Sequence, residues 1–306
     1  MRTPILFIWT VVLICCVTTQ LQAQESWIDT SIHDGLIELQ TNYSFKTLVS
    51  NDSINTTTET LSHLNNAKLY FDKIFQTELD FAVLFIENKK WNKHAYFPPP
   101  GLPQAGKGNI ILGLDKSIVS QEVEKMITQL PKQYWATLKL VYGETINLDL
   151  FYRETLAIHE LAHLYHFKEG TKPQRKWLQE LFATMSMYSF IIEQQNSLFD
   201  LMNTYPEFVL QSGDRMAEYK TLKDFEEKYV QKLTPQNYEW YQMQLYKVAK
   251  SIIDSKGSDI LIRLHDFLIR TDLSKTELLT DSELSRRLSA EVGKEIADIL
   301  TNWMYN

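Results

Sequence analysis

Two histidines four residues apart, with a glutamate beside the first, constrain this chain more than any other feature. The stretch His-Glu-Leu-Ala-His occupies positions 159–163. Residues at i and i+4 lie on one face of a helix, one turn apart, so His159 and His163 present two imidazoles side by side. That geometry suits a single zinc ion. Glu160 lies at the flank of the same face and can reach a water molecule on the metal. The motif predicts a helix that carries a metal site.

The residues around the motif predict a buried helix. They are mostly apolar and recur at helical spacing: Leu156, Ala157, Leu161, Ala162, Leu164 and Tyr165. Gly170 is suited to the C-terminal end of such a helix, and Pro173 follows where a new segment begins. The simpler alternative is an ordinary core helix whose two histidines form hydrogen bonds and bind no metal.

A second apolar helical stretch follows at residues 177–183, with the sequence Trp-Leu-Gln-Glu-Leu-Phe-Ala. Its one carboxylate is Glu180. Two histidines and one glutamate would occupy three positions around a zinc ion and leave the fourth open, as in catalytic zinc sites. The candidate ligand set, for one zinc per chain, is therefore His159, His163 and Glu180.

At these residues the chain resembles the gluzincin metallopeptidases, in which the HExxH helix is followed by a second helix with a glutamate ligand. The stretch at 177–183 is similar to a segment of the large aminopeptidases and of the bacterial peptidase MA-like proteins, and this resemblance implies that Glu180 is the third ligand. The spacing is shorter than in the large aminopeptidases, and Leu181 stands where they have glycine. A metzincin pattern fits poorly, because His166 occupies its glycine position and Glu169 its last ligand position.

The resemblance also implies catalytic roles. Glu160 would act as the general base, and a tyrosine on an aromatic-rich helix before Gly257 would stabilise the oxyanion. Tyr241 is the first choice for that tyrosine and Tyr246 the second, on the strength of their distance from Gly257. The alternative for each is an aromatic residue of the core or surface.

Histidine ligands need a hydrogen-bond partner at their second ring nitrogen. Thr184 lies one turn after Glu180 on the same helix face and is a candidate for that role. His166 follows His163 by three residues and could serve in the same way. We expect it instead to be a partly exposed histidine.

The hydrophobic pattern predicts an α+β fold, and the resemblance implies a gluzincin-like catalytic domain. Residues 24–168 would form a mixed α/β lobe that ends in the HExxH helix, and residues 169–306 a mostly helical lobe that carries Glu180. Apolar spacing predicts a helix over 58–78 and a buried strand over 81–87. By the resemblance, the stretch Gly106–Gly113 would be an edge strand that pairs with substrate along the cleft. The alternative is an ordinary interior strand.

The first 23 residues have the composition of a secretory signal peptide. Arg2 precedes an apolar run of about a dozen residues, and Ala23 provides a small residue before a cleavage point. We expect cleavage after Ala23 and a secreted or periplasmic protein. Both cysteines, Cys15 and Cys16, lie in this segment, so the mature chain would have no disulfide framework.

The charge balance limits the class of partner. The chain carries 31 basic and 38 acidic residues, a net charge of −7, which disfavours nucleic acid and anionic membranes as partners. The leading hypothesis is a secreted zinc endopeptidase with a peptide or protein substrate. A zinc aminopeptidase ranks lower, because residues 101–114 contain no carboxylate to anchor a substrate amine. A third hypothesis is a non-catalytic binding protein that retains the metal.

Overall fold

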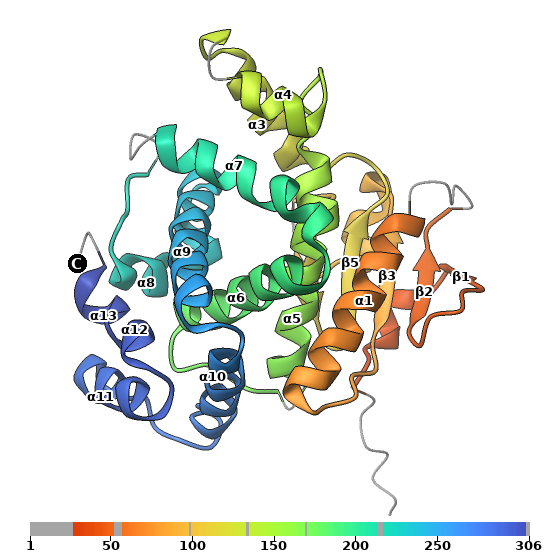
Figure 1. Cartoon of the computed structure of the whole chain (residues 1–306). Helices are drawn as coiled ribbons and strands as arrows, with labels where there is room; N and C mark the ends of the chain where they lie inside the picture. Colours follow the sequence, from red (N-terminus) through yellow and green to blue (C-terminus); the bar gives the residue numbers. More distant parts are fainter. Residues whose placement is uncertain are drawn as a thin grey trace, which may run out of the picture.

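The computed structural model describes residues 27–51, 57–97, 99–132, 135–168, 170–212 and 217–303, so the expected signal peptide lies outside the described residues. A five-stranded sheet with the order β1-β2-β3-β5-β4 forms one side of the molecule (Figure 1). Its strands are β1 (Ile37–Leu39), β2 (Lys46–Val49), β3 (Ala82–Ile86), β4 (Gln104–Gly106) and β5 (Asn109–Gly113). The inner strands β2, β3 and β5 are parallel, and β1 and β4 pair antiparallel at the two edges.

The inner strands β3 and β5 are buried on both faces of the sheet. Side chains such as Val83 and Ile110 belong to the large core on one face, whereas Leu84 and Ile111 pack with Trp91 on the other. This alternation follows from the two-residue period of a strand. Burial of both faces explains why the inner strands are continuous apolar runs in the sequence. The predicted buried strand over 81–87 is confirmed by β3.

The helix predicted over residues 58–78 is confirmed as α1 (Thr58–Phe75). It buries Leu61, Leu64 and Phe71 against the sheet and the helices beyond it. The helix ends earlier than predicted because Gln76 adopts a left-handed conformation with φ of 49°. Its backbone amide still donates to the carbonyl of Asp72, which satisfies an otherwise unpaired group at the helix end.

The expectation that Gly106–Gly113 forms one edge strand is wrong. The stretch spans the end of β4, a turn and β5, and β5 pairs with β3 on one side and β4 on the other. A turn through Lys107 and Gly108, both with positive φ, reverses the chain between the two strands. The edge strand is therefore β4, which comes just before the predicted stretch.

The other regular elements of the described chain are helices. A π-helical turn, η4 (Phe151–Leu156), leads directly into α5 (Ala157–Phe167). The remaining longer helices are α3 (Ile118–Thr128), α4 (Trp135–Tyr142), α6 (Lys176–Gln194), α7 (Phe199–Ser212), α8 (Leu222–Lys232), α9 (Pro235–Lys256), α10 (Asp259–Arg270) and α11 (Asp281–Glu291). Short helices complete the set: η1 (Thr30–His33), η2 (Asn88–Lys90), α2 (Trp91–His94), η5 (Asn196–Leu198), α12 (Lys294–Ala297) and α13 (Ile299–Asn302).

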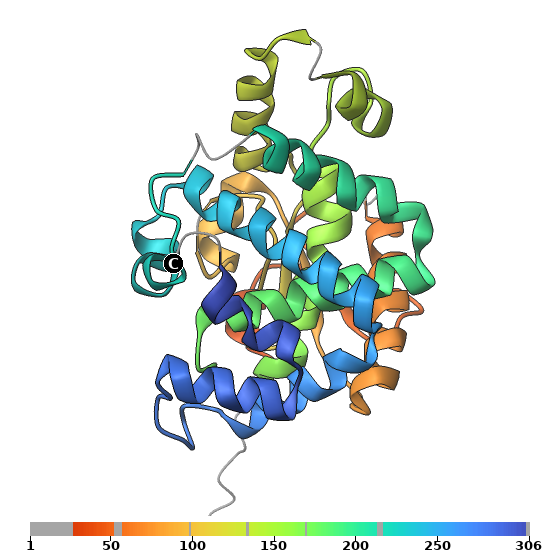
Figure 2. The same cartoon turned by 60° about the vertical axis from the view of Figure 1, so that its left-hand side comes forward.

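The HExxH helix α5 lies between the sheet and the helices α6 and α9 (Figure 1). It packs against α1, β4 and β5 on one side and against α6 on the other. The helix α9 extends across the outer side of α6 and makes the most extensive contact with it (Figure 2). One hydrophobic core extends from Phe45 to Trp303 across these layers. The lobe boundary expected at residues 168 and 169 falls in the link between α5 and α6. Among the described helices, none is long and apolar enough to cross a membrane.

The link between α5 and α6 is tied to the loop that follows α10. The buried Asp272 carboxylate accepts a hydrogen bond from the backbone amide of Lys172 at 2.8 Å, and the amide of Leu273 donates to the Lys172 carbonyl at 2.9 Å. The buried Gln174 side chain donates to the carbonyl of Thr271 at 2.8 Å. These bonds fix where α6 begins relative to α5, and thereby where Glu180 lies relative to the two histidines.

Candidate metal centre

The two helices bring His159, His163 and Glu180 together in a buried cluster. The Nε2 atoms of His159 and His163 are 3.0 Å apart. Glu180 Oε2 lies 3.4 Å from His159 Nε2 and 3.6 Å from His163 Nε2. Potential ligand atoms of the three residues all lie within 4.8 Å of one another. The structure therefore assembles the three residues that the sequence predicts as a ligand set.

This triangle has the dimensions of a zinc site. Tetrahedral zinc, with bonds of about 2.0–2.1 Å to nitrogen and oxygen, separates two of its ligand atoms by about 3.3 Å. The three measured separations, 3.0, 3.4 and 3.6 Å, lie on either side of that value. Two imidazole nitrogens and a carboxylate oxygen are also a donor set that zinc favours. The residues present fit the metal.

Glu180 and His159 have pKa values shifted in the directions that favour metal binding. Burial acts to raise the pKa of Glu180, but the nearby His163 and His159 outweigh it and hold that pKa well below its usual range. Glu180 is therefore an ionised carboxylate. Burial lowers the pKa of His159, which favours the neutral imidazole that metal binding requires. For His163, burial acts in the same direction, but the Glu180 charge outweighs it and raises the pKa.

Each histidine has a partner at its second ring nitrogen. Thr184 Oγ1 lies 3.3 Å from His159 Nδ1, so Thr184 is in the position predicted for a partner of this histidine. His166 Nε2 lies 3.3 Å from His163 Nδ1. The expectation that His166 is partly exposed is wrong, because its side chain is buried and packs against Phe167 and Phe182. Burial also lowers its pKa well below the usual value, so His166 is neutral and its Nε2 can accept a hydrogen bond from His163 Nδ1.

Both oxygens of Glu180 are held by side chains from other helices. The Tyr229 hydroxyl on α8 donates to Oε1 at 2.5 Å, and Gln242 Nε2 on α9 donates to Oε2 at 2.9 Å. Tyr229 has an unusual backbone conformation, with φ of 31° and ψ of −142°. Such strain persists only where surrounding contacts impose it, and the hydroxyl bond to Glu180 is one such contact.

Glu160 lies beside the cluster and faces the edge strand. Its side chain is half-buried, and burial raises its pKa to about 8. The His163 charge and a hydrogen bond from the backbone of Ala105 act in the opposite direction. Since Ala105 is the central residue of β4, the edge strand and the glutamate of the motif are neighbours. A carboxyl group with a pKa in this range can both take up and release a proton near neutral pH.

Tyr241 and Tyr246, the two tyrosines chosen from the sequence, direct their hydroxyls away from the cluster. Tyr241 donates to the carbonyl of Thr221 at 2.8 Å, within a buried aromatic cluster that includes Phe225 and Trp303. Tyr246 donates to Asn203 Oδ1 at 2.8 Å. The structure thus brings neither hydroxyl to the histidines and Glu180, and it favours the alternative of a core aromatic residue for both.

Besides Tyr229, a second tyrosine that the sequence reasoning missed lies at the cluster, Tyr238. Its hydroxyl accepts a hydrogen bond from Gln242 Nε2 at 2.8 Å. Burial, followed by the charges of Glu180 and Glu160, raises its pKa well above the usual value, so the hydroxyl stays protonated. The sequence held one usable signal, because Tyr238 and Gln242 are four residues apart, as His159 and His163 are. No spacing could have indicated Tyr229, which comes from a separate helix.

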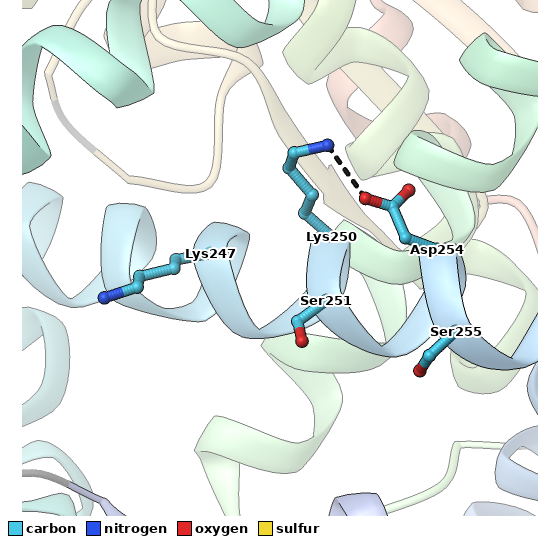
Figure 3. Close-up of a pocket in the computed structure, with 5 residues that line it drawn as sticks. All are labelled: Lys247, Lys250, Ser251, Asp254 and Ser255. Carbon is cyan, nitrogen blue, oxygen red and sulfur yellow. Dashed lines mark hydrogen bonds and ion pairs between the residues drawn. The ribbon is translucent and has the colours of Figure 1, made fainter.

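A shallow hollow of about 430 Å³ lies elsewhere, along α9. It is lined by Lys247, Lys250, Ser251, Asp254 and Ser255 (Figure 3). Lys250 Nζ is paired with Asp254 at 2.9 Å, so its charge is already balanced. None of these five residues belongs to the histidine and glutamate cluster.

Comparison with known proteins adds no assignment. No protein-family model matches the chain, and no curated protein matches it.

Proposed function

We propose that the protein is a zinc-dependent peptidase of the gluzincin type that cleaves within peptide chains. The observation that carries the proposal is the triangle of His159, His163 and Glu180, with Glu160 beside it and a protonated tyrosine facing it. A zinc ion held there would lower the pKa of a water molecule and polarise a peptide carbonyl.

The chain's own residues supply the proton transfers. Glu160 is the general base: its carboxylate takes a proton from the attacking water and passes it to the nitrogen of the leaving amine. A metal cation nearby would favour its ionised form, which opposes the effect of burial.

Tyr238 replaces Tyr241 as the residue that stabilises the oxyanion. Its hydroxyl lies near Glu180 and Glu160, accepts a hydrogen bond from Gln242 and keeps its own proton to donate. A donor aimed at developing negative charge is among the largest contributions to catalysis of this kind.

The edge strand β4 is the proposed docking site for substrate. One edge of β4 pairs with β5, and the residue at its centre, Ala105, contacts Glu160. An extended peptide that adds to this edge would lie over the cluster. Internal cleavage is favoured over removal of terminal residues because residues 101–114, which include β4, offer no carboxylate to bind a free amine.

Peptide cleavage by wild type and by Glu160→Gln tests the proposal. Each purified protein is mixed with a broad peptide library, with and without a chelator, and the products are read by mass spectrometry. We expect internal cuts by the wild type that the chelator abolishes. We expect Glu160→Gln to bind zinc but to lose at least about a hundredfold in rate, the scale of a general base.

Other outcomes would contradict it. Stepwise loss of N-terminal residues would indicate an aminopeptidase. Zinc bound by both proteins, with no cleavage by either, would indicate a protein that holds the metal without turnover.

A further inference from the structure

We propose that Gln242 is a positioning residue that links the third metal ligand to the oxyanion donor. Its side-chain amide holds Glu180 and, through the same nitrogen, sets the direction in which Tyr238 donates its proton. The metal-binding half of this inference stands on the cluster geometry alone, whereas the catalytic half rests on the proposed function.

The hydrogen-bond chemistry fixes the orientation of the Gln242 amide. Gln242 Nε2 donates to Glu180 Oε2, so the nitrogen of the amide, and not its oxygen, faces the carboxylate. That nitrogen carries two hydrogens. One points to Glu180 Oε2 at 2.9 Å and the other to the Tyr238 hydroxyl at 2.8 Å. Both donors of the amide are therefore used within the site.

This arrangement defines the direction of the hydrogen bond between Gln242 and the Tyr238 hydroxyl. A phenol oxygen that accepts from Gln242 keeps its own hydrogen for a different partner. The neighbouring Tyr229 hydroxyl gives its proton to Glu180 Oε1 and lies within hydrogen-bond reach of the Tyr238 hydroxyl, so a substrate oxyanion would compete with the Tyr229 oxygen for the Tyr238 proton. Without Gln242, the Tyr238 hydroxyl could instead rotate and donate to the carboxylate of Glu180.

The same contact acts on the metal ligand. Tyr229 holds Oε1 of Glu180 and Gln242 holds Oε2, the oxygen that faces both histidines. The carboxylate is therefore fixed from two helices before any metal arrives. Residues that orient metal ligands in this way are commonly worth about 10- to 100-fold in metal affinity.

Two substitutions separate a donor role from a packing role. Gln242→Met keeps nearly the same volume without a donor, and Gln242→Glu keeps the shape but replaces the donor with an acceptor. Gln244→Leu is the matched control, because two residues along a helix turn the side chain to the opposite side. There Gln244 lines a separate groove of about 440 Å³ with Val248 and Trp303.

Zinc affinity is the first measurement, made by competition with a chromogenic zinc chelator on each purified protein. We expect Gln242→Met to weaken zinc binding about 10- to 100-fold. The control variant Gln244→Leu should bind zinc as wild type does. Gln242→Glu should alter the zinc affinity by more than Gln244→Leu does. Wild-type affinity in Gln242→Met would overturn the inference.

A double-mutant cycle with Tyr238→Phe is the second measurement. If Gln242 acts through the Tyr238 hydroxyl, Gln242→Met should lower kcat in the wild-type background and have little further effect in Tyr238→Phe, at saturating zinc. If the double variant instead loses kcat by the product of the two single losses, the proposed action of Gln242 through the Tyr238 hydroxyl is wrong.

The two measurements also keep this inference apart from the proposed function. A wild-type protein that binds zinc but cleaves no peptide would refute the peptidase proposal and the catalytic half. The zinc affinities of the Gln242 variants would still decide whether this amide holds Glu180.

Discussion

At the scale of single residues, helical spacing determines the positions of some site residues, and side-chain packing determines the positions of the others. His159 and His163 lie side by side because four residues make about one turn, and this requires no knowledge of the rest of the fold. Tyr238 and Tyr241 are three residues apart on α9, so they are only about 60° apart around the helix. Spacing alone could not tell which one faces the histidines. Tyr241 lies among Phe225, Trp240 and Trp303 instead.

The pair of tyrosines provides a matched test. Tyr238→Phe removes the proposed oxyanion donor, and we expect kcat to fall about 10²- to 10³-fold with little change in KM. Tyr241→Phe should leave kcat close to wild type, and because it leaves the Thr221 carbonyl without its donor it should lower the free energy of unfolding by about 1 kcal/mol. Steady-state kinetics and urea unfolding of both variants check this. A larger loss of kcat in Tyr241→Phe would reverse the assignment.

At the scale of elements, the apolar periodicity predicted the main helices and the buried strand. The boundaries and partners of the strands were harder to predict. β4 has only three residues, and the predicted strand Gly106–Gly113 includes only the last of them, because the Lys107–Gly108 turn leaves almost no polar interval before β5. The π-helical turn before α5 was also missed, since its sequence is that of an ordinary amphipathic helix. The position of α6 depends on contacts about a hundred residues away in the chain, which no local pattern reveals.

The prediction at the scale of elements concerns Asp272, whose carboxylate holds the link between α5 and α6. Burial acts to raise its pKa, but hydrogen bonds from the backbone of Lys172, from the Ser274 side chain and from the Ser274 backbone outweigh it, so the pKa lies below the ordinary value of 3.8. A carboxylate with a lowered pKa in the folded state stabilises the fold above its unfolded pKa, and this contribution is lost as pH falls through the folded value.

We therefore expect Asp272→Asn to lower the free energy of unfolding by about 1–3 kcal/mol at pH 7. The difference from wild type should shrink as the pH falls below the ordinary value of 3.8 and the wild-type carboxyl group itself becomes protonated. Urea unfolding at a series of pH values measures this. A difference that stays constant over that range would mean that the charge of Asp272 contributes nothing.

At the scale of the whole molecule, the candidate site joins two bodies of structure. The sheet and α1 support α5 from one side, and α8, α9 and the loop after α10 hold α6 from the other. A metal bound by both α5 and α6 would connect the two halves of the core. Because such a metal binds the folded chain only, it would stabilise the fold according to its concentration and affinity.

Thermal unfolding with and without zinc tests this coupling. At free zinc about 100 times the dissociation constant, the expected gain is about 2.7 kcal/mol, and the Tm of wild type should rise by several degrees. Glu180→Gln should show a much smaller rise, because one ligand of three is weakened. Equal shifts in the two proteins would place the stabilising zinc at another site.

The most direct test of the central claim is to locate the metal itself. Crystals of the zinc-loaded protein, measured on both sides of the zinc absorption edge, would give an anomalous difference peak for each bound ion. We predict one strong peak per chain, about 2.0–2.2 Å from His159 Nε2, His163 Nε2 and a Glu180 oxygen. Absence of a peak between these three residues in zinc-loaded crystals, or a peak bound by other side chains, would contradict the account.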